Sequence, residues 1–214
     1  MWQNSYIYDG KISDVLCERY QLDRQGEEQA ISDQIEELLA GRHVLELGCG
    51  AGGLTESIAK VAASVLAIDN SPELLAVAVQ KELLPDTVEF RYGDLDILSN
   101  TNRIFDAALV NFWFSHLSKN TTAQFLRKLH SHLSPGAIVF IVDHIYLPEA
   151  GDRLFNQPGK TDTFKVREFG DGIKQQIVRN YYDADKLRNI FALRTSQLKI
   201  QVGNCFWWVN YRPI

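Results

Sequence analysis

The chain has 214 residues, of which 45% are hydrophobic and 23% are charged, and its formal net charge is −5. This size and composition are typical of a single globular domain. No run approaches the roughly 18 apolar residues that a membrane-spanning helix needs, and the negative charge gives no general attraction to nucleic acid. These observations exclude a membrane protein and a nucleic-acid-binding protein, and they favour a small-molecule ligand.

The three cysteines, Cys17, Cys49 and Cys205, lack the spacing of metal ligands, and their odd number argues against a disulfide framework. We therefore expect no metal site. The N-terminal residues are polar and lack the apolar core of a signal peptide, which predicts a cytoplasmic protein. A monomer and a homodimer both remain open.

Residues 1–25 mix aromatic and polar side chains, a combination better suited to packing over a cleft than to forming a core. Ile12–Tyr20 has the spacing of a short helix. Glu27–Leu39 is predicted to be a longer helix, and Gly41 is well placed to end it.

The stretch His43–Asp69 reads as strand, glycine turn, helix and second strand. Its turn, GCGAGG, fits the GxGxxG pattern, and an acid at Asp69 ends the second strand where a ribose offers two hydroxyls. A dinucleotide site is therefore one alternative. Glu46 argues against it, because a carboxylate two residues before the first glycine would repel a pyrophosphate. A ligand with a cationic amino-acid part would instead be attracted by this charge.

The following segments alternate between helix and strand. We predict helices from Ser71-Pro72 to about Leu84, over Thr121–Leu133 and over Ala184–Leu193, and strands over Val88–Tyr92, Phe105–Val110 and Ala137–Val142. Leu147–Gly172 is predicted to be loop-rich, with a short helix near Glu149–Phe155, and Ile173–Tyr182 to be an extra strand. Ser196–Val202 and Cys205–Tyr211 are predicted to form a hairpin through Gly203-Asn204.

Three segments carry a family resemblance. VLELGCGAGGLT, AIDNSPELLAVA and SPGAIVFIVD resemble the corresponding segments of the class I S-adenosylmethionine-dependent methyltransferases, and the terminal hairpin matches that family's antiparallel seventh strand. The resemblance implies an α/β fold: a doubly wound, mostly parallel seven-stranded sheet with an antiparallel C-terminal hairpin, helices on both faces and an N-terminal helical lid. We expect one domain over residues 1–214, with the lid at 1–25 and a substrate-side insertion at 145–175.

The resemblance also implies a cofactor site for S-adenosylmethionine. Glu46, the glycine turn and Asn111 would hold the amino-acid end, Asp69 the ribose, and Asp94 with Leu95 the adenine. The full predicted set is Glu46, Gly48, Cys49, Gly50, Gly52, Asp69, Asn70, Asp94, Leu95 and Asn111.

Aromatic residues and histidines near the strand ends are the candidates for the acceptor side. Ligands of open parallel sheets bind outside the carboxyl ends of the strands. Tyr6 and Tyr8 in the lid are predicted to contact the substrate, although packing alone is at least an equal alternative for them. Phe112 and Trp113 after the fourth strand are predicted to line the substrate site, where one of them could wall a flat substrate or the adenine. His116 is the preferred general base, weighed evenly against a capping or packing role, and His144 is the second candidate.

Four basic residues of the predicted insertion are candidates for an anionic substrate group, although solvated surface is the favoured interpretation for each: Arg153, Lys160, Lys165 and Arg167. Together the observations predict a methyltransferase that acts on an O, N or C nucleophile of a small metabolite and releases S-adenosylhomocysteine. The alternatives are an NAD-dependent oxidoreductase and a non-catalytic S-adenosylmethionine-binding protein of the same fold.

Overall fold

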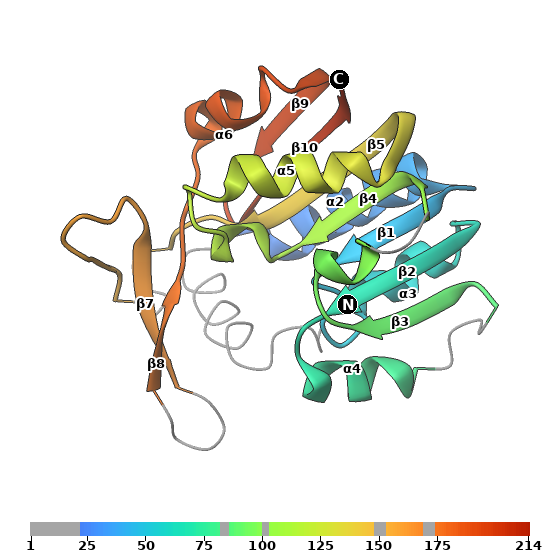
Figure 1. Ribbon diagram of the computed structural model, residues 1–214, viewed down its shortest axis with the longest axis horizontal. Helices are drawn as coiled ribbons and strands as arrows, with labels where there is room; N and C mark the ends of the chain where they lie inside the picture. The colour runs from blue at the N-terminus through green and yellow to red at the C-terminus, as the bar shows by residue number, and fades with distance from the viewer. Residues whose placement is uncertain (1–21, 82–85, 100–102, 148–152, 169–173) are drawn as a thin grey trace.

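A computed structural model describes residues 22–81, 86–99, 103–147, 153–168 and 174–214 (Figure 1). Tyr6, Tyr8 and the helix predicted over Ile12–Tyr20 lie outside the described residues, and so does the N-terminal lid up to residue 21.

The main element is a seven-stranded sheet with the order β3-β2-β1-β4-β5-β10-β9 (Figure 1). The pairs among β1 to β5 are parallel, whereas β10 is antiparallel to both β5 and β9. The strands of this sheet are β1 (His43–Leu47), β2 (Ser64–Asp69), β3 (Val88–Tyr92), β4 (Phe105–Asn111), β5 (Leu133–His144), β9 (Thr195–Val202) and β10 (Phe206–Pro213). The predicted mostly parallel sheet with a C-terminal hairpin is confirmed.

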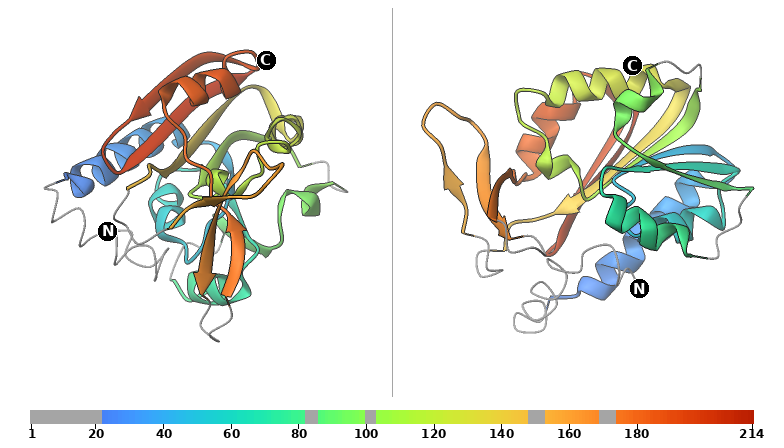
Figure 2. Two further views of the ribbon diagram at one scale, coloured as in Figure 1. Left: turned by 90° about the vertical axis from the view of Figure 1, so that its left-hand side faces the viewer. Right: turned by 60° about the horizontal axis from the view of Figure 1, so that its bottom comes forward.

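Helices cover both faces of this sheet (Figures 1 and 2). They are α2 (Arg24–Leu39), α3 (Gly53–Ala59), α4 (Pro72–Val79), α5 (Thr122–Ser131) and α6 (Ala184–Phe191), with short 3-10 turns at η1 (Leu95–Leu98) and η2 (Phe114–His116). One hydrophobic cluster joins α2, α3 and α4 to one face, and the other joins η1, α5 and α6 to the opposite face. Successive residues of the central strands alternate between the two clusters, because neighbouring side chains of a strand point to opposite faces.

Local capping explains where two of the helices start. Ser71 accepts a hydrogen bond from the Leu74 amide, and Pro72 occupies the first turn of α4, where its missing N–H costs nothing. Asp183 caps α6 by accepting from the Lys186 amide at 2.9 Å. Helix α5 ends at Ser131, and Leu133, predicted as its last residue, is the first residue of β5.

The segment Leu147–Gly172, predicted to be loop-rich, instead contains two strands of a small antiparallel sheet, and the extra strand predicted over Ile173–Tyr182 is confirmed as its third strand. This sheet consists of β6 (Phe155–Asn156), β7 (Thr163–Glu168) and β8 (Lys174–Val178) in the order β6-β7-β8. Phe155, expected in a short helix, is the first residue of β6 and stacks on Phe164 with 6.0 Å between the ring centroids. This cross-strand pairing lies between segments about ten residues apart, so a local pattern does not reveal it.

The small sheet stands at the side toward which the arrowheads of the parallel strands point (Figure 1). The parallel strands have their carboxyl ends on that side, and open α/β sheets bind their ligands there. Within the described part of the chain, no helix is long and apolar enough to cross a membrane.

Glu27 of α2 ties the first described helix to the terminal hairpin. Its carboxylate accepts hydrogen bonds from the backbone amides of Asn204, Cys205 and Phe206, at 2.5, 3.0 and 3.1 Å. These amides sit at the turn between β9 and β10, so the hairpin end is held against α2.

The Glu27→Gln substitution should therefore destabilise the fold by about 1–2 kcal/mol, because it removes charge-assisted hydrogen bonds from three backbone donors. Urea unfolding measures the free energy. Glu37→Gln, at an exposed position of the same helix, is the matched control and should change the stability little. Equal stabilities of the two variants would contradict this role of Glu27.

Candidate active site

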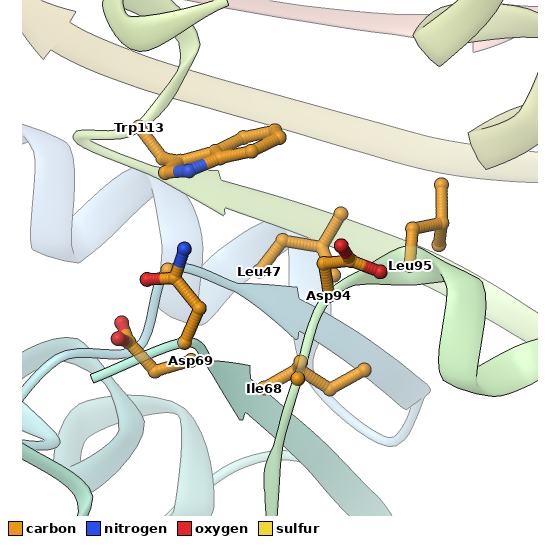
Figure 3. Close-up of a pocket in the computed structure, with 9 residues that line it drawn as sticks. Leu47, Ile68, Asp69, Asp94, Leu95 and Trp113 are labelled. Atoms are coloured by element: carbon orange, nitrogen blue, oxygen red, sulfur yellow. The ribbon is translucent and has the colours of Figure 1, made fainter. Parts of the chain in front are cut away.

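A pocket opens at the carboxyl ends of β1 and β2 (Figure 3). The indole of Trp113 lies on one side of it and Asp69, Asp94 and Ile68 lie across from it, with Leu47 between and Leu95 beside Asp94 (Figure 3). The complete lining is Leu47, Gly48, Ile68, Asp69, Asn70, Gly93, Asp94, Leu95 and Trp113. The pocket thus combines a flat aromatic wall, an apolar floor and two carboxylates.

Gly48 lets the chain turn directly beneath this pocket. Its φ is +76°, and a Cβ at this position would lie 2.8 Å from the Asn111 carbonyl oxygen and 3.0 Å from Cβ of Trp113. The amides of Gly48 and Cys49 both donate to the carbonyl of Ile68, at 2.9 and 3.2 Å. Only glycine combines the left-handed conformation with this close approach.

Asp69 joins the glycine turn to the start of α4. One carboxylate oxygen accepts from the Gly50 amide and the other from the Ser71 amide, each at 2.8 Å. A carboxylate has about four acceptor positions, so these bonds leave about two for a ligand. These two hydrogen bonds hold Asp69 at the pocket wall, where a pair of hydroxyl donors can reach it.

Asp94 and Leu95 form part of the wall that faces Trp113. The Asp94 side chain caps η1 by accepting from the Asp96 amide at 2.7 Å, and Leu95 is buried. Capping and ligand binding are compatible here, since the carboxylate has further acceptor positions. Asn70, on the β2 side, is exposed and completes the rim.

Glu46 of β1 and Asn111 of β4 lie on neighbouring strands, next to the glycine turn. Glu46 is fully buried; Thr55 donates to one of its oxygens at 2.7 Å, and Nδ2 of Asn111 lies 3.4 Å from the other. Burial raises the pKa of Glu46 from 4.5 to about 7, against the lowering effect of these hydrogen bonds. Within the described residues, the buried Oδ1 atom of Asn111 has no hydrogen-bond partner. A buried carboxylate and an unused acceptor suit a cationic donor such as an ammonium group.

The aromatic loop after β4 divides its side chains between two environments. Phe112 has a φ of +50°, is buried, and stacks on His144 with 4.7 Å between the ring centroids. Phe112 therefore belongs to the core cluster that includes Phe206, at 5.5 Å, and it is not among the residues that line the pocket. Trp113, the next residue, faces the pocket, and its far side packs on Phe125 at 5.2 Å.

His116 joins the loop after β4 to the small sheet and is not among the residues that line the pocket. Its Nδ1 lies 3.0 Å from the Val178 carbonyl oxygen, and its Nε2 lies 3.1 Å from Nη1 of Arg179. A guanidinium only donates, so Nε2 accepts and Nδ1 carries the proton. Burial and the charge of Arg179 lower the pKa of His116 to about 4, so the ring is neutral near pH 7. His144, at the end of β5, packs its ring against both Phe112 and Phe206, which also contact each other.

Two residues of this region are not among the site residues predicted from the sequence. Thr55 reaches Glu46 from the helix after the glycine turn, nine residues later. Arg179 follows β8 and is buried against Ser115, His116 and Asp143. Asp143 in turn accepts from the Ser115 amide at 2.8 Å. The helical spacing of Thr55 offers a local hint, whereas the place of Arg179 depends on how the small sheet packs.

Comparisons with known proteins agree with this fold. The profile of a family described as "Methyltransferase domain" matches residues 44–136. The ubiquinone biosynthesis O-methyltransferase of Xanthomonas oryzae pv. oryzae (strain PXO99A) is 35% identical over 105 residues, which cover 48% of this chain and 43% of that protein. The mitochondrial enzyme of the same name from Rattus norvegicus is 31% identical over 108 residues, 48% of this chain and 31% of that protein. The matched segment spans less than half the length of these relatives.

A solved structure resembles nearly the whole chain. The structure described as "DhpI-SAM-HEP complex" has a TM-score of 0.69 and 25% sequence identity, with 99% of each chain covered. The seven-stranded sheet with its antiparallel β5-β10-β9 end defines a Rossmann-like methyltransferase fold. The methyltransferase-domain match over residues 44–136 and this structure support the resemblance of the sequence to the class I S-adenosylmethionine-dependent methyltransferases.

The buried Glu46 predicts a pH-dependent stability of the ligand-free protein. Its folded pKa of about 7 lies above the ordinary 4.5, so between these values the folded state binds a proton that the unfolded state has lost. The contribution of Glu46 to stability should therefore fall as the pH rises from about 4.5 to about 7, by roughly 3 kcal/mol in total.

Urea unfolding of the wild type and of Glu46→Gln at a series of pH values measures this contribution. The difference in free energy of unfolding between the two proteins should shift in favour of the variant as the pH rises. A difference that stays constant over this range would contradict a raised pKa at Glu46.

Proposed function

We propose that this protein is an S-adenosylmethionine-dependent methyltransferase that acts on an O, N or C nucleophile of a small metabolite. The observation that carries the proposal is the buried Glu46 behind the Gly48 turn, combined with the pocket between Trp113 and Asp94. A net charge of −5 supports a small acceptor rather than a nucleic acid. The cytoplasmic location stays a prediction.

The residues of the site fit the cofactor part by part. Glu46 and the unused Oδ1 of Asn111 suit its ammonium group, and the Gly48–Gly52 turn, with Cys49 and Gly50, suits close backbone contact with its amino-acid end. Asp69 has acceptor positions left for the ribose hydroxyls. Asp94 and Leu95, with Trp113 across the pocket, suit a flat adenine.

When bound, the cofactor supplies a methyl group activated by a sulfonium. Transfer of this group would be an in-line displacement, so the residues that hold the cofactor would have to keep the acceptor in line with the methyl group, and the acceptor's proton would pass to a base or to water. The protein's task is to orient the two reactants and to exclude water. His116 as that base requires its Nε2 to exchange the hydrogen bond from Arg179 for one from the acceptor.

Neither alternative from the sequence has support. The carboxylate of Glu46 disfavours the pyrophosphate of a nicotinamide dinucleotide, and the relatives are named as methyltransferases. Calorimetric titration with S-adenosylmethionine and with NAD tests the first point, and only the former should bind. Release of S-adenosylhomocysteine in the presence of a panel of metabolites tests turnover. Binding without any release would favour a non-catalytic protein.

The substitution Asp69→Ala should weaken binding of S-adenosylmethionine by about 1–3 kcal/mol, because it removes charge-assisted hydrogen bonds to the ribose. It also removes the bonds to the Gly50 and Ser71 amides, so the affinity is measured well below the melting temperature of the variant. Asp86→Ala, at an exposed position outside the pocket, is the control. An affinity equal to that of the control would show that the ribose binds elsewhere.

The substitution His116→Ala should lower kcat while the affinity for S-adenosylmethionine stays unchanged, since His116 lies outside the cofactor pocket. Because the pKa of His116 is about 4, the wild-type kcat should show no step from this residue between about pH 6 and 8. His132→Ala, at the end of α5, is the control. A step in that range that disappears only in His116→Ala would contradict the assigned protonation, and an unchanged kcat would leave His116 with a packing role.

A further inference from the structure

Thr55 is a polar side chain among the buried residues of α3. Leu54 and Ile58 of the same helix are buried as well. A buried hydroxyl needs a hydrogen-bond partner, whereas valine has nearly the same shape and needs none. The partner of Thr55 is Glu46 of β1, because Oγ1 of Thr55 donates to Oε2 of Glu46 at 2.7 Å. The hydroxyl at this position therefore serves Glu46.

The Thr55 hydroxyl gives its one proton to this carboxylate. Threonine hydroxyls inside helices otherwise bond a backbone carbonyl of the preceding turn. A hydroxyl has a single proton, so the proton that Glu46 accepts is not available to such a carbonyl. Both side chains are 0% exposed, and a hydrogen bond to a charged acceptor is strong in such surroundings. The bond fixes the position of one carboxylate oxygen.

Glu46 points toward α3 because alternate residues of β1 face opposite sides of the sheet. Val44 belongs to the hydrophobic cluster that contains Ile58 of α3, whereas Leu47 belongs to the cluster on the other face. Glu46 shares the side of Val44, so its carboxylate lies between β1 and α3. The next residue, Leu47, lines the pocket, and the glycine turn follows it. The Thr55–Glu46 pair is thus next to the residues that form the pocket.

The second oxygen of Glu46 determines which way the Asn111 amide points. Nδ2 of Asn111 lies 3.4 Å from Oε1 of Glu46. A carboxylate only accepts, so the amide nitrogen faces it and the amide oxygen points elsewhere. That oxygen, Oδ1, is buried and has no hydrogen-bond partner within the part of the chain that the structure describes. Glu46 and Asn111 together therefore leave acceptor atoms for a ligand.

The ionisable groups that act on Glu46 are acidic. Burial raises the pKa of Glu46 to about 7, and the nearby carboxylate of Asp69, at the pocket wall, adds to this rise. The Cys49 thiol of the glycine turn is neutral near pH 7, because burial raises its pKa. The hydrogen bonds from Thr55 and Asn111 act in the opposite direction, and that from Thr55 has the larger effect.

We infer that Thr55 is a positioning residue for the cofactor, because its hydroxyl fixes the Glu46 carboxylate so that Glu46 and Asn111 offer only acceptor atoms to an ammonium group. The inference rests on the proposed function, since the ammonium group is that of S-adenosylmethionine. A protonated Glu46 would present a donor to the cation, and the Asn111 amide could then turn over. Thr55 opposes this protonation, because its donated hydrogen bond favours the charged carboxylate.

The test measures the affinity of the full chain for S-adenosylhomocysteine, which carries the same ammonium group, by calorimetric titration from about pH 6 to about pH 9. Thr55→Val should weaken binding by about five- to tenfold near pH 6 to 7, and the loss should shrink toward about pH 9, where Glu46 is charged in both proteins. Thr55→Ser keeps the hydroxyl and should stay within about twofold of the wild type throughout. The ratio of two affinities cancels the titration of the ligand itself.

Two controls separate this effect from a general loss of structure. Thr195→Val removes another buried hydroxyl, which donates to the Phe191 carbonyl at 2.9 Å, and it should leave the affinity unchanged. In the Glu46→Gln background, Thr55→Val should cause no further pH-dependent loss, because the carboxylate that Thr55 positions is absent. If Thr55→Val fails to fold, Thr55→Ala, which also lacks the hydroxyl, takes its place.

The inference is overturned if Thr55→Val binds as tightly as the wild type, if its loss is the same at every pH, or if Thr55→Ser fails to restore the affinity. A pH-independent loss would be that of a residue with only a packing role. These failures differ from failure of the proposed function, which appears as no binding of S-adenosylhomocysteine to the wild type. That last result overturns both.

Discussion

The site depends on the carboxylate of Asp69, which bonds the Gly50 amide with one oxygen and the Ser71 amide with the other. These two bonds join the glycine turn after β1 to the start of α4, so the ends of two neighbouring strands and the helix that follows are held in one arrangement. The pocket wall is formed by the same carboxylate. In the proposed function the same group also binds the ribose, through the acceptor positions that these two bonds leave.

Glu46 costs stability, and only the proposed function gives this buried carboxylate a binding role. A fully buried carboxylate with one short hydrogen bond, from Thr55, is disfavoured in its charged form, and its raised pKa expresses this cost. An apolar residue would suit the strand better. Beside Gly48 and Asn111, a cationic ligand would compensate the buried charge of Glu46.

The small sheet β6-β7-β8 adds buried charge at the side of the main sheet where the parallel strands end. It brings Arg179, distant in sequence from the glycine turn, to the loop that also carries Trp113 and His116. The parallel sheet thus forms the pocket, and the insertion after β5 adds buried charge beside the loop after β4. This division follows from topology, since additions at the carboxyl ends of strands change the ligand side without disturbing the core.

The sequence by itself determined what depends on local chemistry. The glycine turn, the acid at the end of β2, the Ser71-Pro72 helix start and the strand periods follow from φ preferences, capping and the alternation of side chains, and the order of elements then fixes most of the sheet. Only the tertiary structure decided that Phe112 faces the core while Trp113 faces the pocket, that His116 bonds Val178 and Arg179, and that the insertion forms a sheet. These features arise from contacts between segments far apart in the chain, and such contacts leave no periodic pattern in either segment alone.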